Sequence, residues 1–176
     1  MKTRVTAALL AVGIALAVSA ATAGPAAAAT TGSETVSGIL VTSGVSGTRT
    51  AISTVAVANG VFKGVGRIVE IPSLPTDPPN VTRDDLVYPE GTMHLVNTTV
   101  GASFTVNPHN CLFRGTLQED SQIIGGIGLF ANASGTFTGT ISPQGLASRN
   151  PDGSCSTTQP SLHEVDKVAF SGTLSF

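Results

Sequence analysis

The amino-acid sequence predicts an all-β chain, and three observations carry this prediction. Apolar and polar residues alternate in short runs along most of the 176 residues. Almost no window places apolar residues at helical spacing. Gly, Pro and Asn separate the short runs, which is typical of a sandwich or barrel of antiparallel strands.

The first 29 residues have the pattern of a secretory signal peptide. Lys2 and Arg4 precede an apolar run over residues 5–18, which is short for a membrane span. Small residues follow and include an A-x-A pattern that ends at Ala29, so we expect cleavage after about this residue. The alternative is a retained membrane anchor. The expected product is one extracellular domain over residues 30–176, with no membrane attachment.

The charge of this domain bears on its partners. Without Lys2 and Arg4, seven basic residues stand against eleven acidic ones, and the sequence has no basic cluster. We therefore do not expect a nucleic-acid partner.

Cys111 and Cys155 are the two cysteines of the sequence. In a secreted chain they are expected to form an intramolecular disulfide, which would stabilise the fold by about 4 kcal/mol in the chain-entropy model. The alternative is a pair of free thiols, one of them reactive.

Nine stretches have the alternation of a strand. In chain order they cover residues 34–42, 50–58, 61–71, 91–97, 101–107, 111–118, 121–126, 134–142 and 162–176. Asn107–Asn110 is predicted to be a turn that joins two of them in a hairpin. The last stretch is the clearest, because Val168, Phe170 and Leu174 share one face, which we expect to be buried.

Two longer segments lack this alternation. Residues 72–91 are rich in proline and of mixed charge, and residues 143–160 form a Gly-, Pro- and Ser-rich loop that contains Cys155. Long loops in a small domain are often functional, and the alternative is that both are ordered connections.

The stretch "IIGGIGLFANASGTFTG" contains a dinucleotide-binding spacing, G-x-G-x-x-A, at Gly126, Gly128 and Ala131. That motif requires a helix after the glycines, but Thr and Phe alternate there as in a strand. Nucleotide binding is therefore not expected, and residues 129–135 are predicted to be a bend between two strands.

The same stretch resembles the G-G-x-G-x-F-x-x-A-x-G signature of the allene oxide cyclase and dirigent superfamily. The matching residues are Gly125, Gly126, Gly128, Phe130, Ala133 and Gly135. The resemblance implies a single antiparallel barrel of about eight strands over residues 30–176. The sequence also resembles small secreted proteins of actinobacteria.

The resemblance implies two kinds of activity. Allene oxide cyclases hold an unstable epoxide in a largely apolar barrel, and dirigent proteins orient radical or quinone-methide intermediates through inward acids and arginines. Neither uses a cofactor, so none is expected. The matched motif is structural, so it assigns no catalytic residue, and a homo-oligomer is compatible with the resemblance.

Motifs of the common catalytic classes are absent from the sequence, including G-x-S-x-G, H-E-x-x-H, C-x-x-C and the P-loop. The three histidines, His94, His109 and His163, occur in separate segments. We interpret them as surface or turn residues and predict no metal site.

Strand alternation points to one candidate polar pocket. If the last strand is regular, Glu164 and Asp166 face inward near one end of the barrel and need partners, for which Arg67, Arg114 and His94 are the candidates. If that strand begins only at about Val168, both acids lie in solvent.

Two classes of function remain open. The first is a secreted barrel that binds or orients a small apolar molecule without a cofactor. The second is a non-enzymatic structural or interaction protein with a solid barrel, whose surface contacts a partner. An open cavity of about 300 Å³ or more would favour the first.

Overall fold

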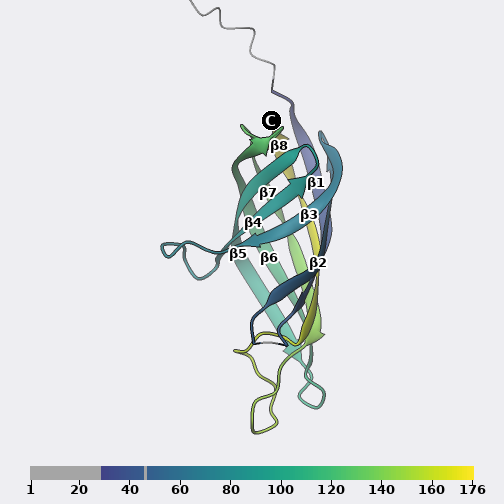
Figure 1. Cartoon of the computed structure of the whole chain (residues 1–176), viewed down its shortest axis with the longest axis vertical. Helices are drawn as coiled ribbons and strands as arrows, with labels where there is room; N and C mark the ends of the chain where they lie inside the picture. The colour runs from purple at the N-terminus through teal and green to yellow at the C-terminus, as the bar shows by residue number, and fades with distance from the viewer. Residues whose placement is uncertain (1–28, 46) are drawn as a thin grey trace, which may run out of the picture.

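A computed structural model describes residues 29–45 and 47–176, which form a closed barrel of eight antiparallel strands (Figure 1). The strands are β1 (Thr31–Ser43), β2 (Thr50–Gly60), β3 (Lys63–Ile71), β4 (Val81–Tyr88), β5 (Gly91–Val106), β6 (Leu112–Gly128), β7 (Ser134–Leu146) and β8 (His163–Ser175). Each strand pairs with the next, and β8 pairs with β1. The predicted all-β fold and the barrel are confirmed.

The predicted signal peptide falls almost entirely on residues 1–28, which are outside the described part of the chain. Within the described part, the structure contains no helix that could cross a membrane.

The strand number differs from the nine predicted stretches for two reasons. Residues 91–97 and 101–107 form one long strand, β5, and residues 111–118 and 121–126 form β6. In β5 a register shift between Thr99 and Gly101 interrupts the alternation without ending the strand. In β6 the alternation continues through the acidic pair Glu119 and Asp120, which separated the two predicted stretches. In addition, β4 lies inside the segment that was predicted to be a loop over residues 72–91, so the loop itself is only residues 72–80.

The interior faces of β7 and β8 alternate glycine with large side chains. Three cross-strand pairs show this pattern: Gly139 with Phe170, Phe137 with Gly172, and Gly135 with Leu174. A Cβ atom at Gly172 would lie 1.9 Å from the carbonyl oxygen of Thr136. Each large side chain therefore lies over a glycine of the neighbouring strand, which lets the strands curve tightly.

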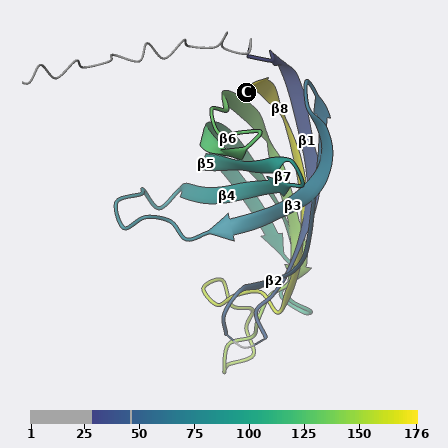
Figure 2. The ribbon, with the colours of Figure 1, turned by 45° about the horizontal axis from the view of Figure 1, so that its top comes forward.

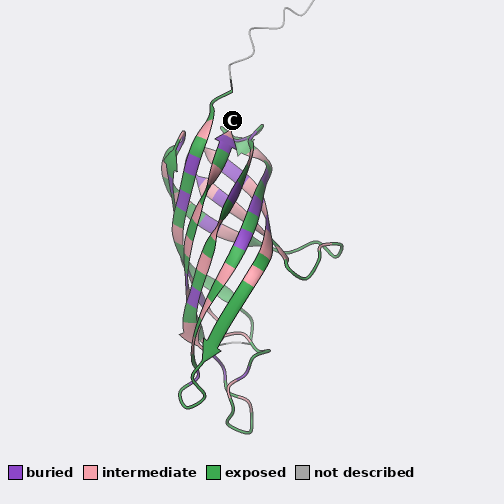
Figure 3. Ribbon diagram, turned by 180° about the vertical axis from the view of Figure 1, so that it is seen from behind, coloured by how far each residue is buried: buried purple, intermediate pink, exposed green. Residues whose placement is uncertain are grey.

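An aromatic cluster fills the upper end of the barrel, which is the end near the C-terminus in Figure 1. It consists of Phe62, Tyr88, Phe130 and Phe176. The ring centroid of Phe62 lies 5.0 Å from those of both Tyr88 and Phe130, with near-perpendicular planes. Figure 3 shows that many of the buried positions lie in the upper part of the strands, whereas their lower ends are largely exposed.

The glycine-rich stretch forms the β6–β7 turn that carries Phe130 into this cluster. β6 ends at Gly128, which has a φ of 64°, and residues 129–133 form turns with no helix. The predicted bend is confirmed. Gly125 and Gly135 also have positive φ, and a Cβ at Gly126 would lie 2.1 Å from the Thr92 carbonyl oxygen.

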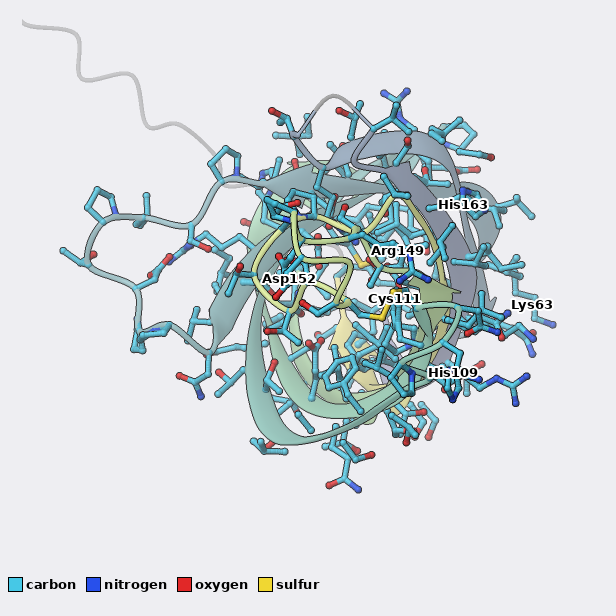
Figure 4. All side chains as sticks on the ribbon, turned by 90° about the horizontal axis from the view of Figure 1, so that it is seen from below. Lys63, His109, Cys111, Arg149, Asp152 and His163 are labelled. Carbon is cyan, nitrogen blue, oxygen red and sulfur yellow. A yellow bond between two sulfur atoms is a disulfide. The ribbon has the colours of Figure 1, made fainter. Side chains whose placement is uncertain are left out.

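A disulfide between Cys111 and Cys155 holds the lower end together, as predicted. It joins the β5–β6 turn to the loop over residues 147–162, and Figure 4 shows it close to Arg149 in that loop. The guanidinium of Arg149 also donates to the His109 carbonyl oxygen at 2.8 Å, so the two segments are fixed to each other twice.

The barrel wall is weakest between β2 and β3. These strands pair over four positions, from Ala56 with Gly66 to Asn59 with Lys63. Below that point β3 leaves with β4 while β2 continues to the lower end (Figure 2). The wall therefore opens on this side of the lower half.

The glycine pattern on β8 gives the first testable prediction. Gly172→Ala is expected to lower the free energy of unfolding by about 2 kcal/mol or more, because the new Cβ displaces the β7 backbone. Urea unfolding measures this loss. Ser171→Ala, at the adjacent exposed position, is the control and should change stability by less than about 0.5 kcal/mol. Equal effects of the two substitutions would contradict this account of the barrel interior.

Candidate functional site

A cavity of about 340 Å³ lies inside the barrel below the aromatic cluster. Apolar atoms make up most of its surface, and apolar side chains from several strands account for half of the residues that line it. They include Val36, Leu40, Ile68, Leu86, Leu95, Leu117, Phe137, Ile141, Val168 and Phe170. Barrels of eight strands are just wide enough either to be filled by side chains or to hold one small ligand. Here the upper half is filled and the lower half is hollow.

Five carboxyl groups line the same cavity, and we call them the carboxylate belt. Its members are Glu70 on β3, Asp84 on β4, Glu119 on β6, and Glu164 and Asp166 on β8. Two of them, Glu119 and Asp166, are almost completely buried. Buried carboxyl groups are costly unless they are paired, so their partners decide what the site can do.

Arg49 is the cation that reaches into this belt. It precedes β2, and its guanidinium donates to Asp166 Oδ2 at 3.0 Å and to Glu70 Oε1. These bonds cross the gap where β2 and β3 separate. β2 and β3 have no backbone pairing at this gap. The ion pairs of Arg49 link the start of β2 to β3 and β8 instead.

The opposite side of the belt is satisfied by neutral donors. The side-chain amide of Asn97 donates to Asp84 Oδ2 at 2.7 Å, and the Thr99 hydroxyl donates to Glu119 Oε1 at 3.2 Å. Both donors are on β5, which adjoins β4 and β6. No positive group bonds either of these two carboxyls in the described part of the chain.

Burial raises the pKa of three members of the belt, Asp84, Glu119 and Asp166, and nearby negative charges add to this effect at Asp84 and Asp166. Burial, together with the charges of Glu70 and Glu119, raises the pKa of Asp84 to about 7. Burial and the neighbouring Glu164 raise the pKa of Asp166, against the opposing effect of Arg49. Burial also raises the pKa of Glu119. Near neutral pH, the cavity thus contains carboxyl groups that gain or lose a proton easily.

Asp166 is the most deeply buried member of the belt, with 4% of its surface exposed. Its Oδ2 atom accepts from Arg49, and a hydrogen bond with the Glu164 side chain helps to raise the pKa of Asp166. Its Oδ1 atom has almost no accessible surface, so a molecule in the cavity does not reach this oxygen.

The sequence-predicted pocket residues divide into two groups. β8 is regular from His163, so the interpretation that it begins at Val168 is wrong, and Glu164 and Asp166 both line the cavity. The three predicted partners do not line it. Arg67 and Arg114 are exposed on the outer face, and His94 lies 2.7 Å from Asp85 instead of from either acid.

The residues that sequence reasoning missed are Arg49, Asp84 and Glu119. Arg49 follows a polar turn, and a register shift between Val41 and Thr42 in the β1–β2 pairing alters the facing of this segment. Asp84 belongs to the unpredicted strand β4. Glu119 lies two residues after Leu117 and therefore on the same inward face of the strand. This alternation was the one sequence signal that could have identified Glu119 as a pocket residue.

Arg83 also borders the cavity but is held at its rim. Its guanidinium binds both carboxylate oxygens of Asp77, at 2.7 and 2.9 Å. This bidentate pair lowers the pKa of Asp77 to about 2 and fixes the loop over residues 72–80 to β4. The loop is therefore an ordered connection.

Neither a metal site nor a comparison with known proteins identifies the function of this cavity. No group of three or more His, Cys, Asp or Glu side chains is arranged to hold a metal ion among the residues that the structure describes. No protein-family model, no curated protein and no solved structure matches the chain. The resemblance to allene oxide cyclases and dirigent proteins stays a prediction.

The raised pKa of Asp84 predicts how stability depends on pH. Because the folded-state pKa lies above the unfolded value, this group's stabilisation is fully present below about pH 4 and is lost as the pH rises through about 7. Asp84→Asn is therefore expected to increase the free energy of unfolding at pH 8 by about 2 kcal/mol and to change it little at pH 4. Denaturant unfolding at the two pH values measures this difference.

Asp120→Asn is the matched control, because Asp120 is an exposed carboxylate on the outer face of β6. It should show no such pH-dependent gain. A variant at Asp84 that is less stable than the wild type at pH 8 would contradict the placement of this carboxyl group.

Proposed function

We propose that this protein is a secreted barrel that binds or orients a small apolar molecule in its interior cavity, without a cofactor. One observation carries the proposal, the hollow of about 340 Å³ between mainly apolar walls. Ligand cavities in proteins begin at about 300 Å³ and combine apolar walls with a few polar groups that fix the ligand's orientation. The carboxylate belt and Asn97 supply such groups.

The alternative is a structural protein with a solid barrel. Its interior would be filled along its whole length by side chains such as those of the aromatic cluster. The lower half instead leaves space beside Leu117 and Ile141, so the binding function is favoured.

Binding is also favoured over catalysis by nucleophilic attack. Within the part of the chain that is described, no hydroxyl of the cavity lining hydrogen-bonds a carboxyl group or another base; these hydroxyls belong to Ser73, Thr82 and Ser121. Activation of a hydroxyl requires an adjacent base oriented by a third group. The protonated carboxyls could orient a reactive intermediate, as the dirigent-like expectation requires, by donating hydrogen bonds to it.

Filling the cavity tests the binding function. The neutral probe 1-naphthalenemethanol is expected to bind the wild-type protein at one site. Leu117→Trp should weaken that binding by about tenfold or more, because the indole occupies the space beside Ile141. Isothermal titration calorimetry measures both affinities.

Leu112→Trp is the control, since Leu112 lies on the same strand but is exposed outside the cavity. It should leave the affinity unchanged. Ile141→Phe provides a second filling variant, and thermal unfolding confirms that each variant is folded. Absence of probe binding to the wild type, or equal binding by Leu112→Trp and Leu117→Trp, would refute the proposal.

The proposed export has a separate test. Expression of the full chain in a bacterial host with a secretion pathway should release a protein into the periplasm or medium that lacks about 29 N-terminal residues. Intact mass spectrometry of this product locates the cleavage site. A product that keeps the first 29 residues and stays in the membrane would support the retained anchor instead.

A further inference from the structure

We propose that the ligand of this cavity is an apolar molecule with a neutral primary carboxamide, whose N–H and C=O groups bind Asn97, Ser121 and Glu119 on the β5–β6 wall. This inference deepens the proposed function and rests on it.

Three buried polar side chains on neighbouring strands form this wall. Asn97 on β5 and Ser121 on β6 are each 4% exposed, and Glu119 on β6 is 5% exposed. Asn97 lies directly opposite Ser121 in the β5–β6 pairing, which places their Cβ atoms about 5 Å apart. Glu119 is two residues before Ser121 and lies on the same inward face. All three side chains line the cavity.

One polar atom of each side chain has no hydrogen-bond partner within residues 29–45 and 47–176. The side-chain amide nitrogen of Asn97 donates to Asp84, which leaves the carbonyl oxygen Oδ1 of Asn97 free. Glu119 Oε1 accepts from the Thr99 hydroxyl, which leaves Oε2 free. The hydroxyl oxygen Oγ of Ser121 is the third free atom.

These three atoms are accessible from the cavity. Among the described residues, the buried side-chain nitrogen and oxygen atoms that lack both a hydrogen bond and accessible surface belong to Thr42, Tyr88 and Asp166. Asn97 Oδ1, Glu119 Oε2 and Ser121 Oγ are not among them, so each keeps accessible surface, which faces the cavity that these residues line. A buried polar atom without a partner costs free energy, and a ligand group placed there recovers it.

The chemistry of the three free atoms selects the polar group of the ligand. Asn97 Oδ1 and the Glu119 carboxylate accept hydrogen bonds, whereas the Ser121 hydroxyl also donates one. A primary carboxamide has two N–H donors and a carbonyl acceptor, so it can satisfy all three atoms. A hydroxyl group has a single hydrogen to donate, and an ester has none.

The electrostatics of the cavity favour a neutral polar group over a charged one. The carboxylate belt repels an anion, and Arg49 is already bound by Glu70 and Asp166. An ammonium group would lose its hydration in a cavity whose surface is mostly apolar, and the cost of that loss is far smaller for a neutral amide.

The opposite wall defines the remainder of the ligand. β1 is four strands away from β5 in the closed barrel of eight, so its inward side chains face the β5–β6 wall across the cavity. Val36 and Leu40 on β1 line the cavity, together with Val168 on β8. An apolar body placed against them removes hydrocarbon surface from water while the carboxamide reaches the polar wall.

Five probes with a common naphthalene body test this selection on the wild-type protein. They are 1-naphthamide, methyl 1-naphthoate, which has a carbonyl but no N–H, 1-naphthalenemethanol, the anion 1-naphthoate and the cation 1-naphthylmethylamine. Calorimetric titration at pH 8 is expected to give the highest affinity for the amide, about tenfold or more above that for the ester. An alcohol or a charged probe that binds as tightly as the amide would overturn the inference.

Substitutions then assign the preference to the wall. Glu119→Gln keeps an acceptor for Thr99 but turns an N–H donor toward the ligand, so the advantage of the amide over the ester should fall by about fivefold or more. Ser121→Ala removes the donor to the carbonyl, so it should weaken the binding of both the amide and the ester.

Asp120→Asn is the matched control, because Asp120 lies between these two residues but is exposed on the outer face. It should preserve both affinities, and thermal unfolding confirms that each variant is folded. An amide advantage that is unchanged in Glu119→Gln would contradict the assignment to this wall.

The outcomes distinguish this inference from the proposed function. If the alcohol binds and Leu117→Trp weakens that binding, but the amide binds no more tightly than the alcohol, only the inference fails. If none of the five probes binds, both the inference and the proposed function fail.

Discussion

The packing of four aromatic rings at the upper end of the barrel is the interaction on which the rest of the structure depends. Eight strands enclose an interior that is just wide enough to be filled by side chains. Here the β2–β3 and β6–β7 turns carry Phe62 and Phe130 inward, where they meet Tyr88 and Phe176. With a packed core at one end, the barrel can close without filling the other, and a cavity remains.

Because side chains need not fill the lower half, it can hold buried carboxyl groups, which lower the stability of the barrel. Burial of Asp84, Glu119 and Asp166 opposes their ionisation, and hydrogen bonds from β5 and from Arg49 offset only part of that cost. Local violations of the rules for a stable core are typical of functional sites. The same carboxyl groups also make part of the cavity polar. They therefore both destabilise the barrel and contribute to the candidate binding site.

The sequence predicted the fold class and the disulfide, because these depend on regular alternation and on the pairing of two cysteines. It left the facing of Glu164 and Asp166 open between the barrel interior and solvent, since this depends on where the last strand begins. The partners of these acids could not be predicted in the same way. One extra residue in a strand reverses the face of the sheet on which each later side chain of that strand lies. The register shift near Val41 in the β1–β2 pairing has this effect and cannot be read from the sequence. β4 was missed because its consecutive charges, over residues 83–85, resemble those of a loop.

The seam between β1 and β8 has a consequence for folding kinetics. It joins residues as far apart as Thr31 and Ser175, which are 144 positions apart, whereas every other neighbouring pair in the barrel consists of consecutive strands. Local hairpins can therefore form a curled sheet first, and the entropy of closing the longest loop delays the seam. Until the seam forms, β1 and β8 are open edges that can pair with another molecule. The time needed for closure, more than the final stability, then determines how long the chain is exposed to aggregation.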